Sequence, residues 1–345
     1  MYARDLLEAL HNLQPEDMEI VPLRAPKPFS RKSLATKFMN FWLEILWLNI
    51  LLPLAVRKHK IDVLHMPANN IAPLVRIPQV CSIHDVHFMT NSKGRDPLWR
   101  TYARWHFRFA ARHADKILCD THMARTEIIE LLGADEKKTE VINLGLPQRE
   151  ALEEDLRSVA ELPPYILSVG AIATNKNFSS LVKAFSELVK SGKNGGHKLI
   201  IAGPPACGHS EVIDIIHQEG LTDKVTLTGK VSDSLLAALY QRASVFVFPS
   251  LAEGFGFPPL EAMHYGVPVA ASTAPCIPET LGEAPLYFDP RDVAGMANAI
   301  HRLITDEKVR RQLISAGADM SRKYSWDKTA RETWSAYRSL TGRCP

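Results

Sequence analysis

The chain is most constrained by a stretch in which an apolar run is followed by a glycine-containing loop and a proline-initiated helix. Residues 245–248 (Val-Phe-Val-Phe) are β-branched or aromatic without polar alternation, as in a parallel strand buried on both faces. Gly254 and Gly256 follow, where the backbone must turn tightly or approach another group closely. Pro258 and Pro259 suit the first turn of a helix. The stretch therefore predicts a strand, a glycine loop and a helix N-terminus in succession.

This order of elements favours a phosphorylated ligand, because the free N–H groups and the dipole of a helix N-terminus attract negative charge. The same stretch contains two carboxylates, Glu253 and Glu261. Carboxylates repel phosphate, but they accept hydrogen bonds from sugar hydroxyls. Phosphate and sugar together indicate a nucleotide-sugar. A loop with a helix-capping glutamate would explain the same residues, and this alternative stays open.

The spacing of Glu253 and Glu261 closely resembles the E-x7-E motif of retaining GT-B glycosyltransferases, specifically glycosyltransferase family 4. Residues 266–269, 277–279 and 288–290 resemble the same family, so the resemblance covers most of the chain. It implies two Rossmann-like domains that face a cleft. It also implies a donor-binding site that contains Glu253, Gly254, Phe255, Gly256, Phe257 and Glu261.

Apolar segments alternate with helical patterns along the whole chain, which predicts an α/β fold with mostly parallel, doubly wound sheets. Ligands of such sheets bind beyond the carboxyl ends of the strands. We expect strands at residues 18–23, 61–66, 79–83, 116–119 and 139–144 in the first half, and at 165–169, 198–202, 225–227 and 245–248 in the second.

A charged segment, residues 149–161, is interpreted as the interdomain linker. We therefore expect an N-terminal Rossmann-like domain over residues 1–160, on the acceptor side according to the resemblance. A C-terminal nucleotide-sugar-binding domain is expected over residues 161–324. The resemblance also implies that the last helix crosses back, so that residues 325–345 join the first domain.

Residues 2–10 resemble the first helix of the family, which normally follows a first strand and a glycine-rich loop. Met1 falls where that loop should end, so we expect the first strand of the N-terminal domain to be missing. Its loss would leave a gap of roughly 10 Å in the sheet. Either the neighbouring strands close together or the first domain is weakened. We hypothesise that the native start lies upstream, or that the chain is a degraded relative.

His84 follows the predicted strand at 79–83. Taken by itself, a lone histidine is more often structural than chemical. The sequence Ile-His-Asp at 83–85 resembles the strand-end histidine of the family, which faces the donor sugar. The resemblance implies a catalytic role for His84, with Asp85 as a further candidate.

Gly170 and Lys176 lie in the loop after the predicted strand at 165–169, where a lysine is normally an ordinary solvated residue. The loop resembles the family's glycine-loop-Arg-Lys-Asn motif, which implies that Lys176 contacts the donor diphosphate and takes part in catalysis. Asn175 replaces the usual Arg, which puts a second cationic contact in doubt. Val231 lies in a segment that resembles the one whose backbone reads the nucleotide base, although its neighbours also suit a helix N-cap.

Positive charge is concentrated between residues 24 and 116, with sixteen Lys and Arg against five Asp and Glu. Such a basic region indicates that the protein binds an anionic partner. The predicted helix at 96–115 has a cationic stripe and an apolar stripe, and two interpretations stay open. In the first, the apolar side is packed and the cationic side is solvated. In the second, the helix is a docking site for an anionic membrane or for the acceptor's pyrophosphate. Its cationic stripe is Arg100, Arg104, Arg108 and Arg112, and its apolar stripe is Leu98, Tyr102, Trp105 and Phe109.

Residues 38–56 are rich in Phe, Trp, Leu and Ile and form the membrane candidate of the sequence. A spanning helix needs about 20 mostly apolar residues. Asn40, Glu44, Asn49 and Pro53 interrupt the apolar run. We interpret it as an amphipathic or buried helix, and contact with a membrane surface stays open.

Composition and missing motifs narrow the chemistry further. The five cysteines form no C-x-x-C pair, which excludes a zinc pattern and fits a reducing cytosol. No G-x-G-x-x-G follows a predicted strand, and neither a Walker A motif nor D-x-D occurs. We therefore expect neither a cofactor nor a bound metal. The expected location is cytoplasmic, with a peripheral position at the inner face of the membrane as an open alternative.

Together the residues and the resemblance indicate a metal-independent retaining glycosyltransferase. The hypothesis is transfer of a hexose, with mannose from GDP-mannose as the best guess, to a lipid-linked saccharide in bacterial surface polysaccharide synthesis. The expected partners are the nucleotide-sugar donor, the lipid-linked acceptor and an anionic membrane surface, without nucleic acid. The alternative is a non-catalytic GT-B-like partner or scaffold in a polysaccharide-assembly complex. A sugar phosphorylase is a second rival, but no lysine context suits its cofactor.

Overall fold

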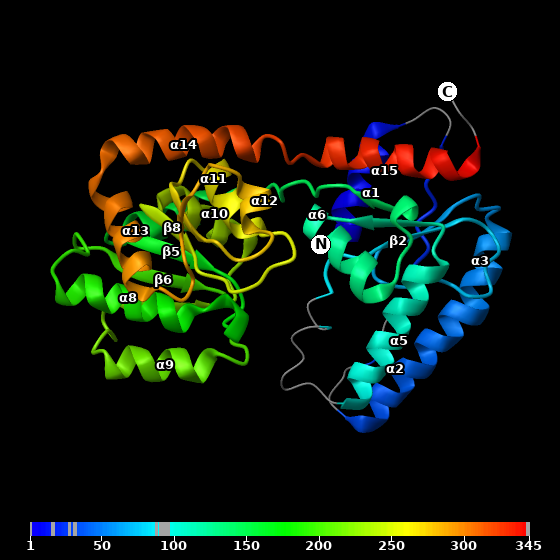
Figure 1. Cartoon of the computed structure of the whole chain (residues 1–345), viewed down its shortest axis with the longest axis horizontal. Coiled ribbons are helices and arrows are strands. Elements are labelled where there is room, and N and C mark those ends of the chain that lie inside the picture. Colours follow the sequence, from blue (N-terminus) through cyan, green and yellow to red (C-terminus); the bar gives the residue numbers. More distant parts are fainter. Residues whose placement is uncertain are drawn as a thin grey trace. The chain divides into compact units, whose positions relative to one another are not determined.

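The fold is known from a computed structural model, which describes residues 2–14, 18–26, 29, 33–86, 89 and 97–342, with the backbone alone for 34, 35, 37 and 97–100. The chain divides into two compact units (Figure 1). The first comprises Met1–Gly145 with Ser325–Pro345, and the second comprises Leu146–Tyr324. The second unit thus begins at Leu146, ahead of the boundary near residue 160 that the sequence suggested, and the C-terminal helix groups with the first unit.

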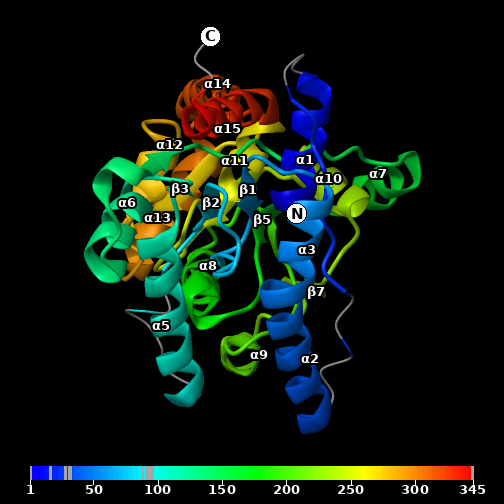
Figure 2. The same ribbon diagram turned by 90° about the vertical axis from the view of Figure 1, so that its right-hand side faces the viewer.

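The first unit is built on a four-stranded parallel sheet with the order β1-β2-β3-β4 (Figure 2). Its central strands, β2 and β3, are almost completely buried, in agreement with their lack of polar alternation. Their register places Cys81 beside Ile117. The strands are β1 Leu64–Met66, β2 Gln79–Ser82, β3 Lys116–Cys119 and β4 Thr139–Val141.

The strand predicted at residues 18–23 is wrong, because this segment has no regular secondary structure. Its apolar side chains are nevertheless used. Met18 and Ile20 pack against the cluster formed by the first and last helices, and Leu23 packs against a second cluster around Leu52 and Leu64. The alternating pattern therefore reflects burial of side chains without the backbone pairing that defines a strand.

In the first unit, three consecutive helical segments cover the helix predicted at 38–56 and follow one another without a gap from Leu34 to Lys58. A capping box between Ser33 and Thr36 begins the first of these segments. The last helix, α15, packs against the first, α1. The helices are α1 Tyr2–Leu13, α2 Leu34–Leu46, the π-helical η1 Trp47–Leu51, α3 Leu52–Lys58, α5 Pro97–His113, α6 His122–Glu127, the π-helical η2 Ile128–Leu132, the 3₁₀ helix η3 Glu136–Lys138 and α15 Trp326–Thr341.

The second unit contains a six-stranded sheet with the order β10-β9-β8-β5-β6-β7, and every pairing is parallel. The strand order reverses between β5 and β8, which lie side by side. Ligands of open parallel sheets bind beyond the carboxyl ends of the strands at such a switch point. The strands are β5 Tyr165–Val169, β6 Lys198–Ala202, β7 Val225–Gly229, β8 Val245–Phe248, β9 Val269–Ser272 and β10 Leu286–Phe288.

The linker predicted at residues 149–161 is also wrong. Most of the segment is a helix of the second unit, α7 Glu153–Ala160, which packs against α10 and buries Val159. The other helices of this unit are the 3₁₀ helix η4 Thr174–Lys176, α8 Phe178–Lys190, α9 His209–Gln218, α10 Asp233–Arg242, α11 Phe257–His264, α12 Ile277–Leu281, α13 Val293–Thr305 and α14 Glu307–Ser321.

Candidate functional site

Two loops meet at the switch point of the second unit. One follows β5 and contains η4, and the other follows β8 and leads into α11. They are joined by hydrogen bonds: the Leu251 amide donates to the Asn175 carbonyl over 2.8 Å, and the Asn177 side chain donates to the Pro249 carbonyl over 3.1 Å. The two loops therefore form one structure at the carboxyl edge of the sheet, where the sequence predicted a ligand.

Lys176 and Glu253 form an ion pair between these loops. The Lys176 Nζ lies 2.5 Å from Oε1 and 2.7 Å from Oε2 of Glu253, and the Ser250 hydroxyl donates to Oε1 over 2.6 Å. Both side chains are largely buried, with 20% of Lys176 and 11% of Glu253 exposed. Charge-assisted hydrogen bonds of this kind fix both groups in direction. The two predicted catalytic residues of this unit are thus in direct contact.

Glycines shape the backbone around this pair. Gly256 precedes α11 with φ of 93°, a left-handed conformation that favours glycine. At Gly203 a Cβ atom would lie 2.0 Å from the Gly170 carbonyl oxygen, so the loops after β5 and β6 can approach only without a side chain there. The Gly254 carbonyl accepts a hydrogen bond from the Cys276 thiol over 3.0 Å. The glycine loop is therefore held in one conformation by its neighbours.

The two aromatic residues of the loop differ from the rest of the predicted donor site. Phe255 is buried and packs edge-on against Tyr324, with ring centroids 5.4 Å apart. Phe257 is the first residue of α11, and its ring lies 4.8 Å from that of Phe255. Their side chains stabilise the loop, so a contact of Phe255 with a donor would have to come from its backbone.

Glu261 lies one turn into α11 and is only 5% exposed. Its Oε1 lies 2.8 Å from Nη1 of Arg149, whose Nε also pairs with the exposed Asp233 over 3.0 Å. The Arg149 carbonyl accepts a hydrogen bond from Tyr265 over 2.7 Å. Burial lowers the pKa of Arg149, but the two carboxylates outweigh it and raise the pKa above its ordinary value. Arg149 therefore links α11 to the N-terminus of α10.

Val231 lies in the loop between β7 and α10 and is half-buried. The next residue, Ser232, is the N-cap of α10, because its hydroxyl accepts from the Leu235 amide over 3.0 Å. The helix-cap interpretation of this segment is correct, and it leaves the backbone of Val231 at the carboxyl end of β7.

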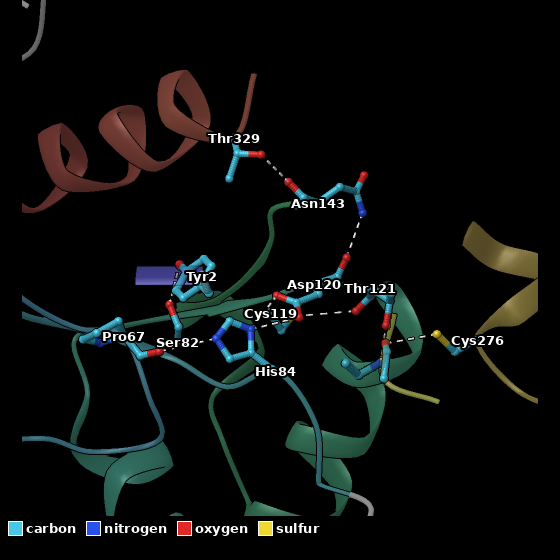
Figure 3. Close-up of polar contacts among 12 residues, drawn as sticks. Tyr2, Pro67, Ser82, His84, Cys119, Asp120, Thr121, Asn143, Cys276 and Thr329 are labelled. Carbon is cyan, nitrogen blue, oxygen red and sulfur yellow. Dashed lines mark hydrogen bonds and ion pairs between the residues drawn. The ribbon is translucent and has the colours of Figure 1, made fainter. Parts of the chain in front are cut away.

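His84 belongs to the first unit and lies just beyond β2. Its Nδ1 donates to the carboxylate of Asp120, at 3.0 Å from Oδ1 and 2.9 Å from Oδ2, and its Nε2 lies 3.4 Å from the Pro67 carbonyl (Figure 3). The ring of Tyr2 meets the imidazole edge-on at 4.4 Å. Burial lowers the pKa of His84, but Asp120 outweighs it, so the pKa is raised above its ordinary value. Asp85 is exposed.

A hydrogen-bonded network lies beside this histidine and meets it through the ring of Tyr2. The Ser82 hydroxyl contacts both the Tyr2 hydroxyl and Nε2 of His65 at 2.8 Å, and Nδ1 of His65 lies 2.5 Å from the Tyr337 hydroxyl. Burial lowers the pKa of His65 to about 3, so its imidazole is neutral at physiological pH. The network ties α1 and α15 to the sheet on which His84 is mounted.

The described parts of the chain contain no cluster of three or more His, Cys, Asp or Glu side chains suited to a metal ion. One helical stretch in these parts, Phe38–Lys58, is long and apolar enough to cross a membrane by length and composition, with 11% of its most apolar window buried.

The sequence matches two families over nearly its whole length. Residues 1–148 match the family described as Glycosyltransferase Family 4, and residues 153–320 match the one described as Glycosyl transferases group 1. The chain belongs to the family 4 type of GT-B glycosyltransferases.

Curated relatives of this glycosyltransferase include two proteins of Escherichia coli. The O-antigen chain mannosyltransferase B is 28% identical over 299 residues, which is 83% of this chain and 76% of the relative. The serotype-specific mannosyltransferase WbdA is 28% identical over 279 residues, or 77% of this chain. The chain spans about a third of the length of WbdA, since the match covers 33% of that protein.

Solved structures show the same fold. Sucrose-phosphate synthase from Thermosynechococcus elongatus superimposes with a TM-score of 0.75 at 20% identity, covering 99% of this chain and 93% of the synthase. Anabaena HepE in complex with UDP and glucose has a TM-score of 0.68 at 19% identity, covering 82% of this chain and 79% of HepE. At these identities the likeness establishes the GT-B architecture.

Sequence reasoning missed two residues of this glycosyltransferase that contact its candidate site residues. Asp120 accepts a hydrogen bond from His84. Its position directly after the predicted strand at 116–119 could have indicated a site residue, because ligands bind beyond the carboxyl ends of parallel strands. Arg149 holds Glu261, but it lay in the segment interpreted as a linker. Its partners are far away in sequence, and no local pattern indicates them.

The His84–Asp120 pair predicts a pH dependence. A histidine with a raised folded-state pKa contributes stability that is fully present below the unfolded value of about 6.5 and is lost as pH rises through the folded value. Asp120→Asn should lower the pKa of His84 and flatten this dependence. The checks are the NMR titration of the His84 ring and urea unfolding between pH 5 and 9, which brackets that ordinary value. The matched control is Asp62→Asn, because Asp62 is exposed in the same unit, whereas Asp85 also raises the pKa of His84. Identical titration of His84 in the wild type and Asp120→Asn would contradict the assignment.

Proposed function

We propose that this glycosyltransferase is a retaining enzyme that transfers a hexose from a nucleotide-sugar to a saccharide acceptor during bacterial surface polysaccharide synthesis. The observation that carries the proposal is the meeting of Lys176 and Glu253 beside the glycine loop at the switch point of the second unit. The names of the E. coli mannosyltransferases support mannose as the hexose and an O-antigen saccharide as the acceptor. GDP-mannose as the donor and a lipid link on the acceptor are the further parts of this proposal.

The proposed donor position follows the chemistry of each group. The diphosphate would lie between Lys176 and the N-terminus of α11, where a cation and free N–H groups attract it. Glu253 would then accept hydrogen bonds from the hexose, and Glu261 from the ribose hydroxyls. Because Lys176 already pairs with Glu253, the diphosphate must share or replace that contact. The backbones of Gly170, Gly254, Phe255, Gly256, Phe257 and Val231 complete the proposed donor site.

The proposed reaction is a front-face displacement that needs no metal. The acceptor hydroxyl attacks the anomeric carbon on the face from which the diphosphate departs, and its proton passes to a phosphate oxygen. Lys176 would stabilise the negative charge that develops on the leaving diphosphate, while His84 would orient the sugar. Catalysis would then be mainly electrostatic and positional.

The decisive experiment is a donor screen with GDP-mannose, GDP-glucose, UDP-glucose and UDP-N-acetylglucosamine. We expect GDP-mannose to raise the unfolding temperature and to release GDP, with both effects unchanged when EDTA is added. A preference for a UDP-sugar would overturn the mannose donor but keep the reaction class. Binding without release of nucleotide diphosphate, in the presence of lipid-linked acceptor fractions, would favour a non-catalytic scaffold.

Lys176→Ala is expected to weaken the binding of nucleoside diphosphate by about 1.5–3 kcal/mol, the usual contribution of a hydrogen bond to a charged group. Binding of the nucleoside without phosphates should hardly change. Isothermal titration calorimetry with GDP and guanosine would measure both affinities. Lys190→Ala is the matched control, because Lys190 also pairs with a glutamate but lies at the far end of α8. Equal loss for GDP and guanosine would contradict the diphosphate contact.

A further inference from the structure

The helical path from α2 through η1 to α3 exposes many large apolar side chains. Exposed apolar side chains do not contribute to the stability of a domain in water, and contiguous exposed apolar patches mark interaction sites. Trp42 is 53% exposed and Ile50 also 53%. The exposed residues are Phe38, Met39, Phe41, Trp42, Leu46, Ile50, Leu51 and Leu54.

The opposite side of the same path is packed against the unit. Leu48, Leu52 and Val56, four residues apart, are buried in a cluster that includes Leu64 of β1 and Ala72. The helix therefore has one side fixed to the folded domain and one apolar side exposed. A helix that crosses a bilayer would have to give up this packed side, so the geometry favours a helix that lies on a surface.

The π-helical segment η1 keeps the exposed residues aligned. Side chains four residues apart drift slowly around an α-helix, because a turn contains 3.6 residues. The π-helical turn of η1, Trp47–Leu51, contains more residues than an α-helical turn, so it reverses this rotation around the helix axis for the residues that follow. Trp42, Leu46, Ile50 and Leu54 thus remain on one exposed stripe across the whole path.

Helix α5 adds exposed aromatic residues and positive charge. The sequence left open whether its apolar stripe is packed. Trp105 is 61% and Tyr102 44% exposed, whereas Phe109 packs partly against the core of the unit. Small residues such as Ala103 and Ala110 form the fully buried side. Trp105 and Phe109 stack with ring centroids 5.4 Å apart. A groove of about 470 Å³ is lined by Thr101, Arg104, Trp105, Arg108, Phe109, Arg112 and His113.

The arginines of this groove are exposed, and within the described part of the chain none of the three forms an ion pair. Two of them donate to backbone carbonyls, Arg104 to Met89 and Arg108 to Leu131. No Asp or Glu occurs in α5, residues Pro97–His113. Arg100 belongs to the same sequence stripe, but its side chain lies outside the described residues.

The two helices belong to one surface. Phe41 of α2 and Tyr102 of α5 meet edge-on with ring centroids 6.3 Å apart. Figures 1 and 2 show that α2 and α5 extend from the sheet of the first unit toward the same side. Exposed aromatic and aliphatic residues lie beside arginines that form no ion pair with any described residue. This combination matches the interface of an anionic bilayer, where apolar groups enter the headgroup region and arginines meet phosphates.

We propose that α2–η1–α3 and α5 together form a docking surface for an anionic lipid bilayer, on which the helices lie without crossing. The apolar stripe supplies insertion, and Arg104, Arg108 and Arg112 supply attraction to lipid phosphates. A shallow apolar helix or a few charges alone bind reversibly and weakly, whereas the two contributions together give stable attachment. The proposal concerns vesicle binding only, so it stands or falls independently of the proposed donor and reaction.

The test is flotation of the full chain with vesicles of phosphatidylcholine alone or with 30% phosphatidylglycerol. We expect binding to the anionic vesicles that weakens as salt rises. Trp42→Glu with Ile50→Glu should weaken this binding at least tenfold, and the Gln replacements of Arg104, Arg108 and Arg112 should remove its salt dependence. Leu162→Glu and Arg311→Gln are the controls, because both residues are exposed in the second unit. Thermal unfolding verifies that each variant is folded.

Three results would overturn the proposal. The first is equal binding to both kinds of vesicle, or to neither. The second is a wild-type dimer, seen by sedimentation equilibrium without lipid, that becomes a monomer in the Trp42→Glu and Ile50→Glu variant, since the surface would then hold a second copy. The third is a helix that spans the bilayer. In that case the protein would stay with the vesicles after extraction at high pH, and residues 38–58 would be protected from protease added on either side.

Discussion

Replacing Glu261 with alanine is expected to destabilise the second unit by about 3 kcal/mol, because it leaves Arg149 buried without its nearest carboxylate. Removing one partner of a buried ion pair costs about 3–5 kcal/mol, and the lower figure applies because the exposed Asp233 remains in contact. Urea unfolding followed by circular dichroism would measure the change. Glu261→Gln keeps the volume and one acceptor oxygen, so it should cost less.

A double variant separates a structural role from donor binding. Glu261→Met combined with Arg149→Met removes both charges and keeps the side-chain volume, and such replacements are often neutral for stability. We expect the double variant to regain most of the lost stability while its affinity for nucleoside diphosphate stays reduced by about 1.5–3 kcal/mol, the loss of a hydrogen bond to a charged group. Affinity that recovers with stability would make Glu261 a structural residue only.

The strands of the second unit illustrate what the sequence reveals. The predicted limits of β5, β6 and β8 agree with the structure, because a parallel strand covered on both faces is apolar throughout and ends where glycine or a polar loop begins. The loops at their carboxyl ends were expected from the same pattern, whereas the roles of Lys176 and Glu253 within them were implied by the resemblance to family 4. Local composition is sufficient when burial is uniform and the ligand position follows from topology.

Features that depend on distant partners could not be predicted in this way. Residues 18–23 have the pattern of a strand, but backbone pairing requires a neighbour that periodicity does not reveal. Helix α7 is short and highly charged, so its single buried residue, Val159, gave no periodic signal. The contacts of Arg149 join segments that are far apart in sequence.

Helix α5 shows a different limitation. The sequence indicated a helix with arginines on one stripe and aromatic residues on another, and the helix is present. The sequence left open whether the aromatic stripe is packed or forms a docking surface. In the structure Ala103, Ala110 and Ala111 are fully buried, and Phe109 is partly buried beside them. Small side chains let a helix pack closely against its neighbours, and the larger Tyr102 and Trp105 remain exposed. Tertiary packing decides which apolar side of a helix faces the core, so the sequence alone could not predict the exposed surface of α5.

Glu253→Gln should have the largest effect on catalysis. The wild-type carboxylate receives hydrogen bonds from Lys176 and Ser250 and lies beside the glycine loop, so its direction is fixed before any donor arrives. Preorganised groups of this kind typically account for about 10²–10³-fold in rate. We therefore expect kcat to fall by about two to three orders of magnitude. Single-turnover release of nucleoside diphosphate from the donor would measure the change, with Glu187→Gln on the exposed side of α8 as the control.

The affinity for nucleoside diphosphate decides what the loss of rate means. In Glu253→Gln the amide no longer neutralises Lys176, so the lysine is free to meet the diphosphate, and the affinity should stay equal or rise. A fall in kcat with unchanged nucleoside diphosphate binding would place the contact of Glu253 on the sugar, in the transition state. If kcat and affinity fell in parallel, the carboxylate would instead be supporting the loop that carries Lys176. The Lys176→Ala and Glu253→Gln double variant then completes the cycle, because two residues that act as one unit give losses that do not add.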